Sequence, residues 1–267
     1  MVAHRVLTVV SLLGLLLGSA GLAMADDAAL PTSESASTYP RPVLKRPLVL
    51  YVGMLEIDGK TASVGLNAGD VGQPINVTPS IFYGLVDRLM VGIVLDHGLC
   101  DGCGRAFDDF GVHGRYFLVP TGGIHLAIET GLDISSIEDG ASKIPVSAIL
   151  QFFAGDEIDL LLVPTLSIGI TNRDGVNREL LELDALVRYQ PDEAFNLFVH
   201  AFYRGVLDPD MGSFTDTTNG GIGLGATYAI SNMVDIGAEV DLTTLFSKDG
   251  NADGRQVIVR LALRFGK

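Results

Sequence analysis

Beyond its first 25 residues, the chain lacks any uninterrupted apolar run as long as the roughly 20 residues that a membrane-spanning helix requires. It is nevertheless hydrophobic, with 48% apolar residues, 32 glycines and a mean hydropathy of +0.37. This combination is unusual for a soluble enzyme. It is typical of a β-barrel whose outer face meets lipid and whose inner face is polar or small.

Basic residues and cysteines are scarce. The 18 Lys and Arg face 32 Asp and Glu, which gives a net charge of −14. Phosphate binding needs clustered Lys and Arg, so nucleic acid is not expected as a partner. The only cysteines, Cys100 and Cys103, form a C-x-x-C pair in a predicted external loop. Without a thioredoxin-like context, a short disulfide is favoured over a redox or metal site.

The first residues have the pattern of a cleavable signal peptide. His4 and Arg5 precede an apolar run over 6–17, and Ala23-Met24-Ala25 forms an A-x-A cleavage site. A membrane anchor is the weaker alternative, because the apolar run is too short to span. We therefore expect a signal peptide over 1–25, a Ser-, Thr- and Pro-rich periplasmic leader over 26–46, and a barrel over 47–267.

The rest of the chain alternates apolar and polar residues in about twelve segments, each near the length of a tilted membrane strand. Short connections alternate with longer acidic ones, as expected of periplasmic turns and external loops. The predicted strands are approximately 48–57, 74–85, 88–97, 107–119, 123–134, 142–154, 158–171, 179–190, 195–206, 219–230, 233–245 and 255–265.

Aromatic residues on the apolar parity gather near the short turns. An aromatic girdle at one membrane boundary explains this clustering, whereas an ordinary sandwich core does not. The residues are Tyr83, Tyr116, Phe152, Tyr189, Phe195, Tyr228 and Phe265.

The last predicted strand alternates most clearly, with apolar residues from Val257 to Leu263 at every second position and Phe265 at its end. Here the chain resembles the porin-like outer-membrane β-barrel proteins of Gram-negative bacteria, whose last strand alternates in this way and ends in an aromatic residue. The resemblance covers the chain from about Arg46. It implies an all-β fold, a single closed antiparallel transmembrane barrel, in the outer membrane after signal-peptide cleavage.

The same resemblance implies partners. These are outer-membrane lipid, lipopolysaccharide and the assembly machinery, which in that family uses the C-terminal strand as its insertion signal. Gly266 and Lys267 follow the aromatic residue and depart from the family pattern.

Charged residues fall on the parity opposite to the apolar face. A lipid-facing Lys or Arg at mid-membrane would cost roughly 2–4 kcal/mol, so these side chains are expected to face the lumen. The pore-lining candidates are Arg115, His113, Glu129, Glu182, Asp184, Arg188, His200, Arg204, Asp235, Glu239, Asp241, Arg260 and Arg264.

Two strand registers follow if the tight turns close directly. The turn at 120–122 places His113 opposite Glu129, and the turn at Pro191 places Asp184 opposite His200. Each pair has two interpretations, a catalytic general base or a hydrogen bond that satisfies the barrel interior.

Catalysis would also need a nucleophile, and no motif singles out the inward candidates Ser147 and Ser167. We therefore favour the hydrogen-bond interpretation and expect no catalytic residue. An outer-membrane hydrolase is the less favoured alternative.

A calcium-loop pattern begins at Asp249, Asn251 and Asp253, with oxygens at alternate positions. The position of the completing Glu is Arg260, which cannot ligate. The same residues suit a polar hairpin loop, so we expect no metal and no cofactor.

These observations predict a narrow channel for passive passage of small polar solutes or ions. Twelve strands lie between side-chain-filled eight-stranded barrels and open porins. The alternatives are a non-transporting barrel, either an enzyme or a structural or adhesion scaffold, and a soluble secreted barrel. The sequence leaves the solute, the oligomeric state and the presence of a plug open.

Overall fold

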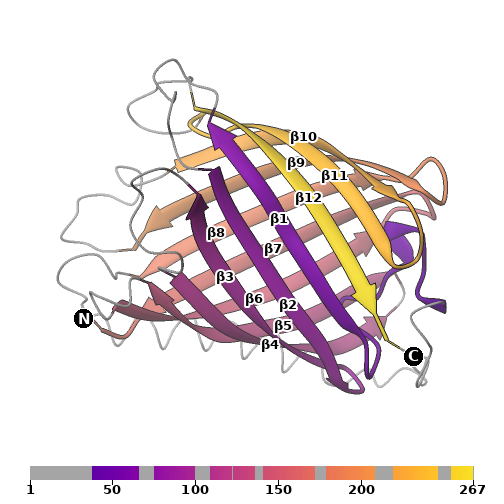
Figure 1. Ribbon diagram of the computed structural model, residues 1–267, viewed down its shortest axis with the longest axis horizontal. Coiled ribbons are helices and arrows are strands. Elements are labelled where there is room, and N and C mark those ends of the chain that lie inside the picture. The colour runs from indigo at the N-terminus through magenta and orange to yellow at the C-terminus, as the bar shows by residue number, and fades with distance from the viewer. Residues whose placement is uncertain are drawn as a thin grey trace.

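The computed structural model describes residues 38–65, 75–99, 109–121, 123–135, 141–171, 179–207, 219–245 and 254–266. Their strands form one closed antiparallel barrel in which β1 pairs with both β2 and β12 (Figure 1). The strands are β1 Leu55–Gly65, β2 Ile75–Val86, β3 Leu89–Leu99, β4 Asp109–Thr121, β5 Ile124–Ser135, β6 Ala141–Phe153, β7 Ile158–Gly169, β8 Leu180–Tyr189, β9 Phe195–Val206, β10 Asn219–Ala229, β11 Val234–Leu242 and β12 Arg255–Phe265. The predicted fold class is confirmed.

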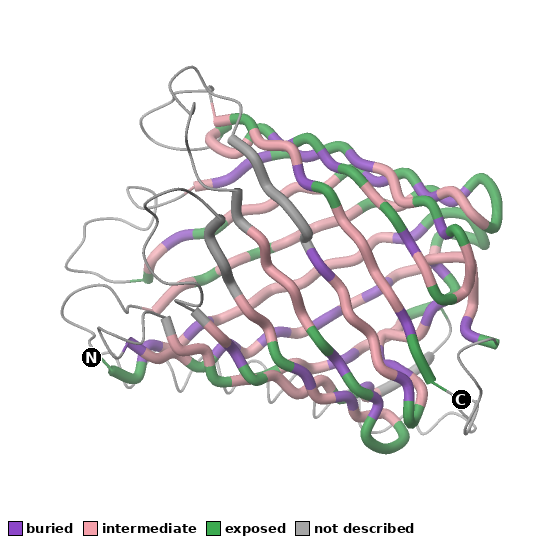
Figure 2. Tube along the Cα trace, viewed as in Figure 1, coloured by how far each residue is buried: buried purple, intermediate pink, exposed green. Residues whose placement is uncertain are grey.

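The strands follow the period-2 pattern because each has one face toward the barrel axis and one toward the surroundings. Buried and exposed positions alternate along many strands (Figure 2). In β10, Leu224 is 64% exposed, whereas its neighbours Gly223 and Gly225 are buried. Apolar side chains therefore cover the outer surface. Exposed examples at other strands are Ile93, Val112, Leu132, Val187, Val199, Ile236, Val240 and Val259. Among the described residues, no helix is both long enough and apolar enough to cross a membrane.

The two barrel ends differ in their connections, as predicted. One end carries the short connections at 87–88, 122–123, 154–157, 190–194 and 230–233, together with the start of β1 and the end of β12. Arg88, Gly123 and Gly155 adopt positive φ angles of 69°, 93° and 91° there, which close the tight turns. We call this the short-turn end, and the opposite end the long-loop end. At the short-turn end, Tyr83, Tyr116, Tyr189, Tyr228 and Phe265 of the predicted girdle are exposed.

The first predicted strand, 48–57, is wrong in its position. The other eleven match the observed strands to within a few residues, but β1 begins only at Leu55. Before it, Gly53 has a φ of 81°, and the Met54 amide donates a hydrogen bond of 3.0 Å to the Tyr51 carbonyl. This turn separates the apolar run at 48–52 from the strand.

Residues 38–54, which we call the inner segment, fold into the short-turn end of the barrel (indigo in Figure 1). Its backbone is held by inward-facing side chains: the Leu44 amide donates to Gln190 Oε1 at 2.9 Å, and Gln151 donates to the Leu44 carbonyl at 3.4 Å. A Cβ at Gly84 would overlap the Tyr51 carbonyl, so only glycine lets the segment approach β2 this closely. The earlier part of the predicted leader, 26–37, lies outside the described residues.

The main apolar cluster lies between the inner segment and the barrel wall. Tyr39, Val49, Leu50 and Met54 of the segment pack against inward side chains of the wall, namely Phe82, Met90, Phe117, Ala127 and Ile149. Burial of this surface stabilises the segment inside the barrel at about 25 cal/mol per Å² of apolar area. The short run η2 (Val43–Lys45), a 3-10 turn, places Leu44 toward the wall, where it is 1% exposed.

Candidate functional site

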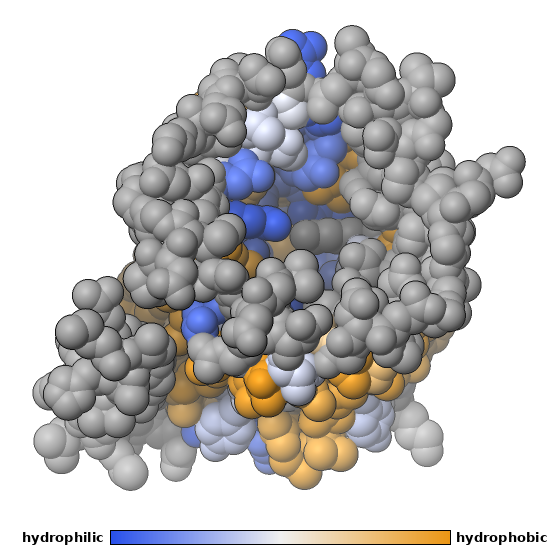
Figure 3. All heavy atoms as spheres, turned by 90° about the vertical axis from the view of Figure 1, so that its left-hand side faces the viewer, coloured by the Kyte–Doolittle hydropathy of each residue, from blue (hydrophilic) through white to orange (hydrophobic). Residues whose placement is uncertain are grey.

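The lumen is lined by polar side chains, and the inner segment packs against its wall at the short-turn end. Seen from the long-loop end, hydrophilic side chains line the hollow, while apolar ones cover the outer surface (Figure 3). Between the inner segment and the barrel wall lies a cavity of about 320 Å³. Its charged and polar lining comprises Arg46, Glu56, Arg115, Glu129, Ser147, Gln151, Arg188 and Arg264.

Asp235 joins the inner segment to the wall. Its carboxylate accepts two hydrogen bonds from Arg46, from Nη1 to Oδ2 at 2.5 Å and from Nη2 to Oδ1 at 2.9 Å. Arg264 Nη1 donates to Asp235 Oδ2 at 2.8 Å, and Arg264 Nε lies 2.6 Å from Glu56 Oε2. Since Arg46, Asp235 and Arg264 are each less than 10% exposed, this network is shielded from water. It is the main polar contact that holds the inner segment in place.

Tyr39 packs beneath the two arginines of this network. The guanidinium carbons of Arg264 and Arg46 lie 5.1 and 5.8 Å from its ring centroid, which is cation–π geometry. Burial raises the pKa of the Tyr39 phenol above its ordinary value, so the ring stays neutral. The inner segment is therefore held against the barrel wall both by apolar packing and by polar contacts.

A second buried carboxylate, Asp159, lies on β7 beside Leu44. It is fully buried and accepts hydrogen bonds from Arg188 Nε at 2.8 Å and from Gln151 Nε2 at 2.6 Å. Sequence reasoning selected Arg188 but missed Asp159. The sequence signal that could have identified Asp159 is its place on the inward parity, at the second residue of β7.

His113 lies between two carboxylates, but not in the predicted register. The β4–β5 turn closes with Thr121 opposite Ile124, and a bulge at 118 then sets Arg115 opposite Glu129 and His113 opposite Gly131. His113 Nδ1 lies 3.3 Å from Glu129, and Nε2 lies 2.8 Å from Asp133. Arg115 Nε donates to Glu129 at 2.7 Å.

His200 is likewise shifted by two residues from its predicted pairing. It stands opposite Leu186, and Asp184 stands opposite Phe202. His200 Nε2 still reaches Asp184 Oδ1 at 3.1 Å along the diagonal, and Nδ1 lies 2.9 Å from Glu239 Oε1. Glu182 is directly opposite Arg204, with 3.5 Å between Oε1 and Nε.

The remaining predicted pore residues also have inward parity. Arg260 donates to Glu239, and Gln256 donates to Asp241 at 2.7 Å. Most of these charges are partly or fully covered by partners, whereas the side chains of Arg204 and Asp184 are 53% and 41% exposed. The predicted disulfide at Cys100 and Cys103 and the calcium pattern at Asp249, Asn251 and Asp253 lie outside the described residues.

The geometry favours hydrogen bonding over catalysis at both histidines. Each ring has a carboxylate on both nitrogens, so neither nitrogen is directed at a hydroxyl. Ser147 Oγ instead shares a hydrogen bond of 2.8 Å with Thr165 Oγ1. General-base catalysis needs a nucleophile within hydrogen-bond reach of the base, and the pairs described here lack that arrangement.

Known structures share this fold. No family model and no curated protein matches the chain. The NanC porin is 10% identical over 80% of this chain and 99% of its own, with a TM-score of 0.57. The KdgM porin is 7% identical with the same coverage and a TM-score of 0.56. An outer membrane channel from Pseudomonas putida F1 is 14% identical over 81% of this chain and 95% of its own, with a TM-score of 0.52. The likeness shows a common barrel fold and confirms the resemblance to porin-like outer-membrane barrels.

Proposed function

We propose that the protein is an outer-membrane channel for passive passage of small polar solutes or ions, narrowed at its short-turn end by the inner segment. The observation that carries the proposal is a lumen lined by charged side chains inside a barrel with an apolar outer surface. An apolar outer face is stable in lipid, and a charged inner face requires water or ion pairs. The porin fold of the neighbouring structures supports the same function.

The proposal includes the orientation and processing of the chain. Residues 1–25 would be removed as a signal peptide, and the short-turn end would face the periplasm. Lipopolysaccharide would surround the long-loop end, and the assembly machinery would insert the barrel. The inner segment would then enter the lumen from the periplasmic side.

Planar-bilayer recording of the purified mature chain tests this function. We expect discrete conductance steps smaller than those of 16-stranded porins, since the barrel has fewer strands and an occupied end. Heat-modifiable migration on gels would verify that the recorded protein is a folded barrel. Silence across repeated insertions of folded protein would refute the channel and favour a non-transporting scaffold.

Ion selectivity should depend on Arg204, the most exposed of the paired lumen arginines described above. Replacing Arg204 by Ala removes a positive charge that its partner does not fully neutralise, so cation preference should rise about twofold. Reversal potentials in a salt gradient measure this ratio. Arg204→Lys keeps the charge and should behave as the wild type; equal shifts in both variants would show that the charge does not set selectivity.

An arginine placed on the outer face should destabilise the barrel, and the cost should be larger near the middle of the membrane than near its boundary. Leu224 lies at the middle of β10, and we expect Leu224→Arg to destabilise the barrel by about 2–4 kcal/mol in lipid. Leu207, exposed just beyond the long-loop end of β9, provides the control, with an expected cost of about 0–1 kcal/mol for Leu207→Arg. Urea unfolding in phospholipid vesicles measures both. Equal costs at the two positions would contradict a membrane-facing band.

A further inference from the structure

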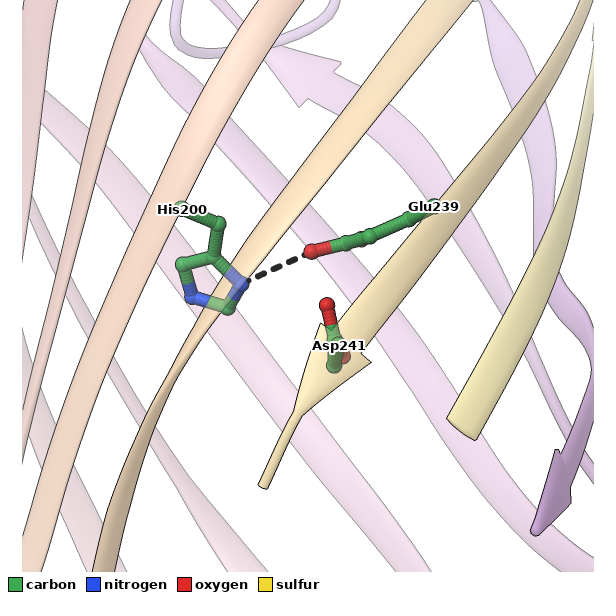
Figure 4. Close-up of side chains that lie close together, drawn as sticks. All are labelled: His200, Glu239 and Asp241. Carbon is green, nitrogen blue, oxygen red and sulfur yellow. Dashed lines mark hydrogen bonds and ion pairs between the residues drawn. The ribbon is translucent and has the colours of Figure 1, made fainter. Parts of the chain in front are cut away.

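Three side chains of the lumen wall converge on one point near the long-loop end. Glu239 and Asp241 are two residues apart on β11, and His200 reaches them from β9 (Figure 4). One ligand atom from each, a ring nitrogen and two carboxylate oxygens, lies within 4.8 Å of the others. The site therefore brings together residues from two strands that are not neighbours in the barrel.

Gly223 on the intervening strand makes this convergence possible. It stands opposite Asp241 on one side and His200 on the other. A Cβ at this position would overlap Asp241 Oδ1 and Glu239 Oε1. Because glycine leaves that volume free, both carboxylates lie over β10 and point toward the histidine.

One acceptor in this cluster lacks a partner. Asp241 is 1% exposed, and its Oδ2 accepts a hydrogen bond from Gln256, but its buried Oδ1 has no hydrogen-bond partner among the described residues. An unsatisfied buried carboxylate oxygen costs free energy. Arg260 forms an ion pair with Glu239, whereas Asp241 has no ion pair among the described residues.

The histidine is oriented as a metal ligand would be. Asp184 lies 3.1 Å from Nε2, on the side of the ring away from Glu239 and Asp241. Metal-binding histidines usually donate their other ring N–H to a carboxylate, which fixes the tautomer and directs the free nitrogen at the ion. This arrangement leaves Nδ1 to face the two carboxylates.

We propose that His200, Glu239 and Asp241 bind a divalent transition-metal ion in the lumen wall, with Zn²⁺ as the best match. One nitrogen and two carboxylate oxygens suit Zn²⁺, which accepts three protein ligands and a water. Calcium fits less well because it requires six to eight oxygens. The ion replaces the hydrogen bond between Nδ1 and Glu239 and gives Asp241 Oδ1 a partner. The site does not depend on whether the barrel conducts.

His113 provides a natural comparison within the same lumen. It too contacts two carboxylates, but Glu129 and Asp133 lie on opposite ring nitrogens. Among the described residues, no third His, Cys, Asp or Glu completes a ligand cluster at His113. His113→Gln is therefore a matched control for His200→Gln.

Isothermal titration of Zn²⁺ into the folded, metal-stripped mature chain tests the proposal, with excess Ca²⁺ and Mg²⁺ present. Both cysteines are replaced by Ser to remove thiolate binding. We expect saturable binding of one Zn²⁺ per barrel, abolished by His200→Gln and retained in His113→Gln. Asp184→Asn, which leaves every proposed ligand in place, should weaken affinity roughly 10–100-fold.

Gly223→Ala tests the site without changing any charge or ligand. The added methyl group displaces the carboxylates, and Zn²⁺ affinity should fall at least about tenfold, as for loss of a supporting contact. Gly114→Ala is the control, because nothing lies within 4 Å of a Cβ there. Absence of saturable uptake in the parent chain would overturn the proposal, as would equal loss in His113→Gln and His200→Gln. Heat-modifiable migration confirms that each variant is folded.

Discussion

Removal of residues 38–50 is expected to raise single-channel conductance several-fold. These residues occupy the short-turn end of the lumen, where Leu44, Val49 and Leu50 are buried against the inner wall. Conductance of a pore rises as its cross-section widens, and the inner segment takes up part of that cross-section at the short-turn end. Planar-bilayer recording of the deletion variant beside the parent chain measures the ratio.

The deletion should also lower the stability of the barrel. It exposes an apolar wall patch that includes Met90, Phe117 and Ile149, each 5% exposed or less in the intact chain. At about 25 cal/mol per Å², loss of this contact costs several kcal/mol. The open variant should therefore unfold at a lower denaturant concentration than the parent.

A point variant separates the effect of the hydrogen bonds between Arg46 and Asp235 from the effect of the apolar contacts of the inner segment. Arg46→Ala removes both hydrogen bonds to Asp235 and should produce frequent transitions to the open conductance level. Lys45→Ala, at the adjacent exposed position, should leave the recordings unchanged.

For the deletion of residues 38–50, a conductance equal to that of the parent chain would show that the inner segment does not restrict the pore.

The barrel was predictable from the sequence because one physical requirement shapes every strand. Each strand must present apolar side chains to lipid and polar or small ones to the lumen, so alternation and turn length repeat along the chain. Leu224 and Gly223 show the pattern at its clearest, one outward and one inward. Eleven strand positions follow from it.

The inner segment could not be predicted in this way. Its run at 48–52 is apolar throughout, and such a run fits either a membrane strand or a buried segment. Lipid and the inner apolar patch are both non-aqueous surroundings, so hydrophobicity alone does not distinguish them. Only the turn at Gly53, where φ is 81°, separates this run from β1.

The registers were wrong by two residues, yet the lumen residues keep inward parity. A shift of two preserves the face on which each side chain lies, whereas a shift of one would reverse it. In the first hairpin, the turn closes with Thr121 opposite Ile124, three residues beyond the predicted pairing, and the bulge at 118 takes one residue back. In the second hairpin, Tyr189 pairs with Leu197 instead of Phe195. Parity therefore predicts which side chains line the lumen, and it does not predict their partners. That is why the contact of His200 with Glu239, across an intervening strand, was not foreseen.

Replacement of Asp159 by Ala is expected to cost about 3–5 kcal/mol of unfolding free energy, the usual effect of breaking a buried ion pair. Asp159 is fully buried, and its loss leaves the Arg188 guanidinium without its carboxylate and Gln151 without an acceptor. Since the chain has no tryptophan, far-UV circular dichroism during urea unfolding in vesicles is the suitable measurement. Asp156→Ala, in the exposed turn before β7, should change stability by less than about 0.5 kcal/mol.

The double variant Asp159→Leu with Arg188→Met separates the two contributions to that cost. A buried pair gains Coulomb energy but loses hydration, so its removal as a unit is often nearly neutral. We therefore expect the double variant to recover most of the stability that Asp159→Ala loses. If the double variant is as unstable as the single one, the pair itself stabilises the barrel. If Asp159→Ala changes the unfolding free energy no more than Asp156→Ala does, water reaches Arg188. The short-turn end of the lumen is then more hydrated than the burial of Asp159 and Arg188 indicates.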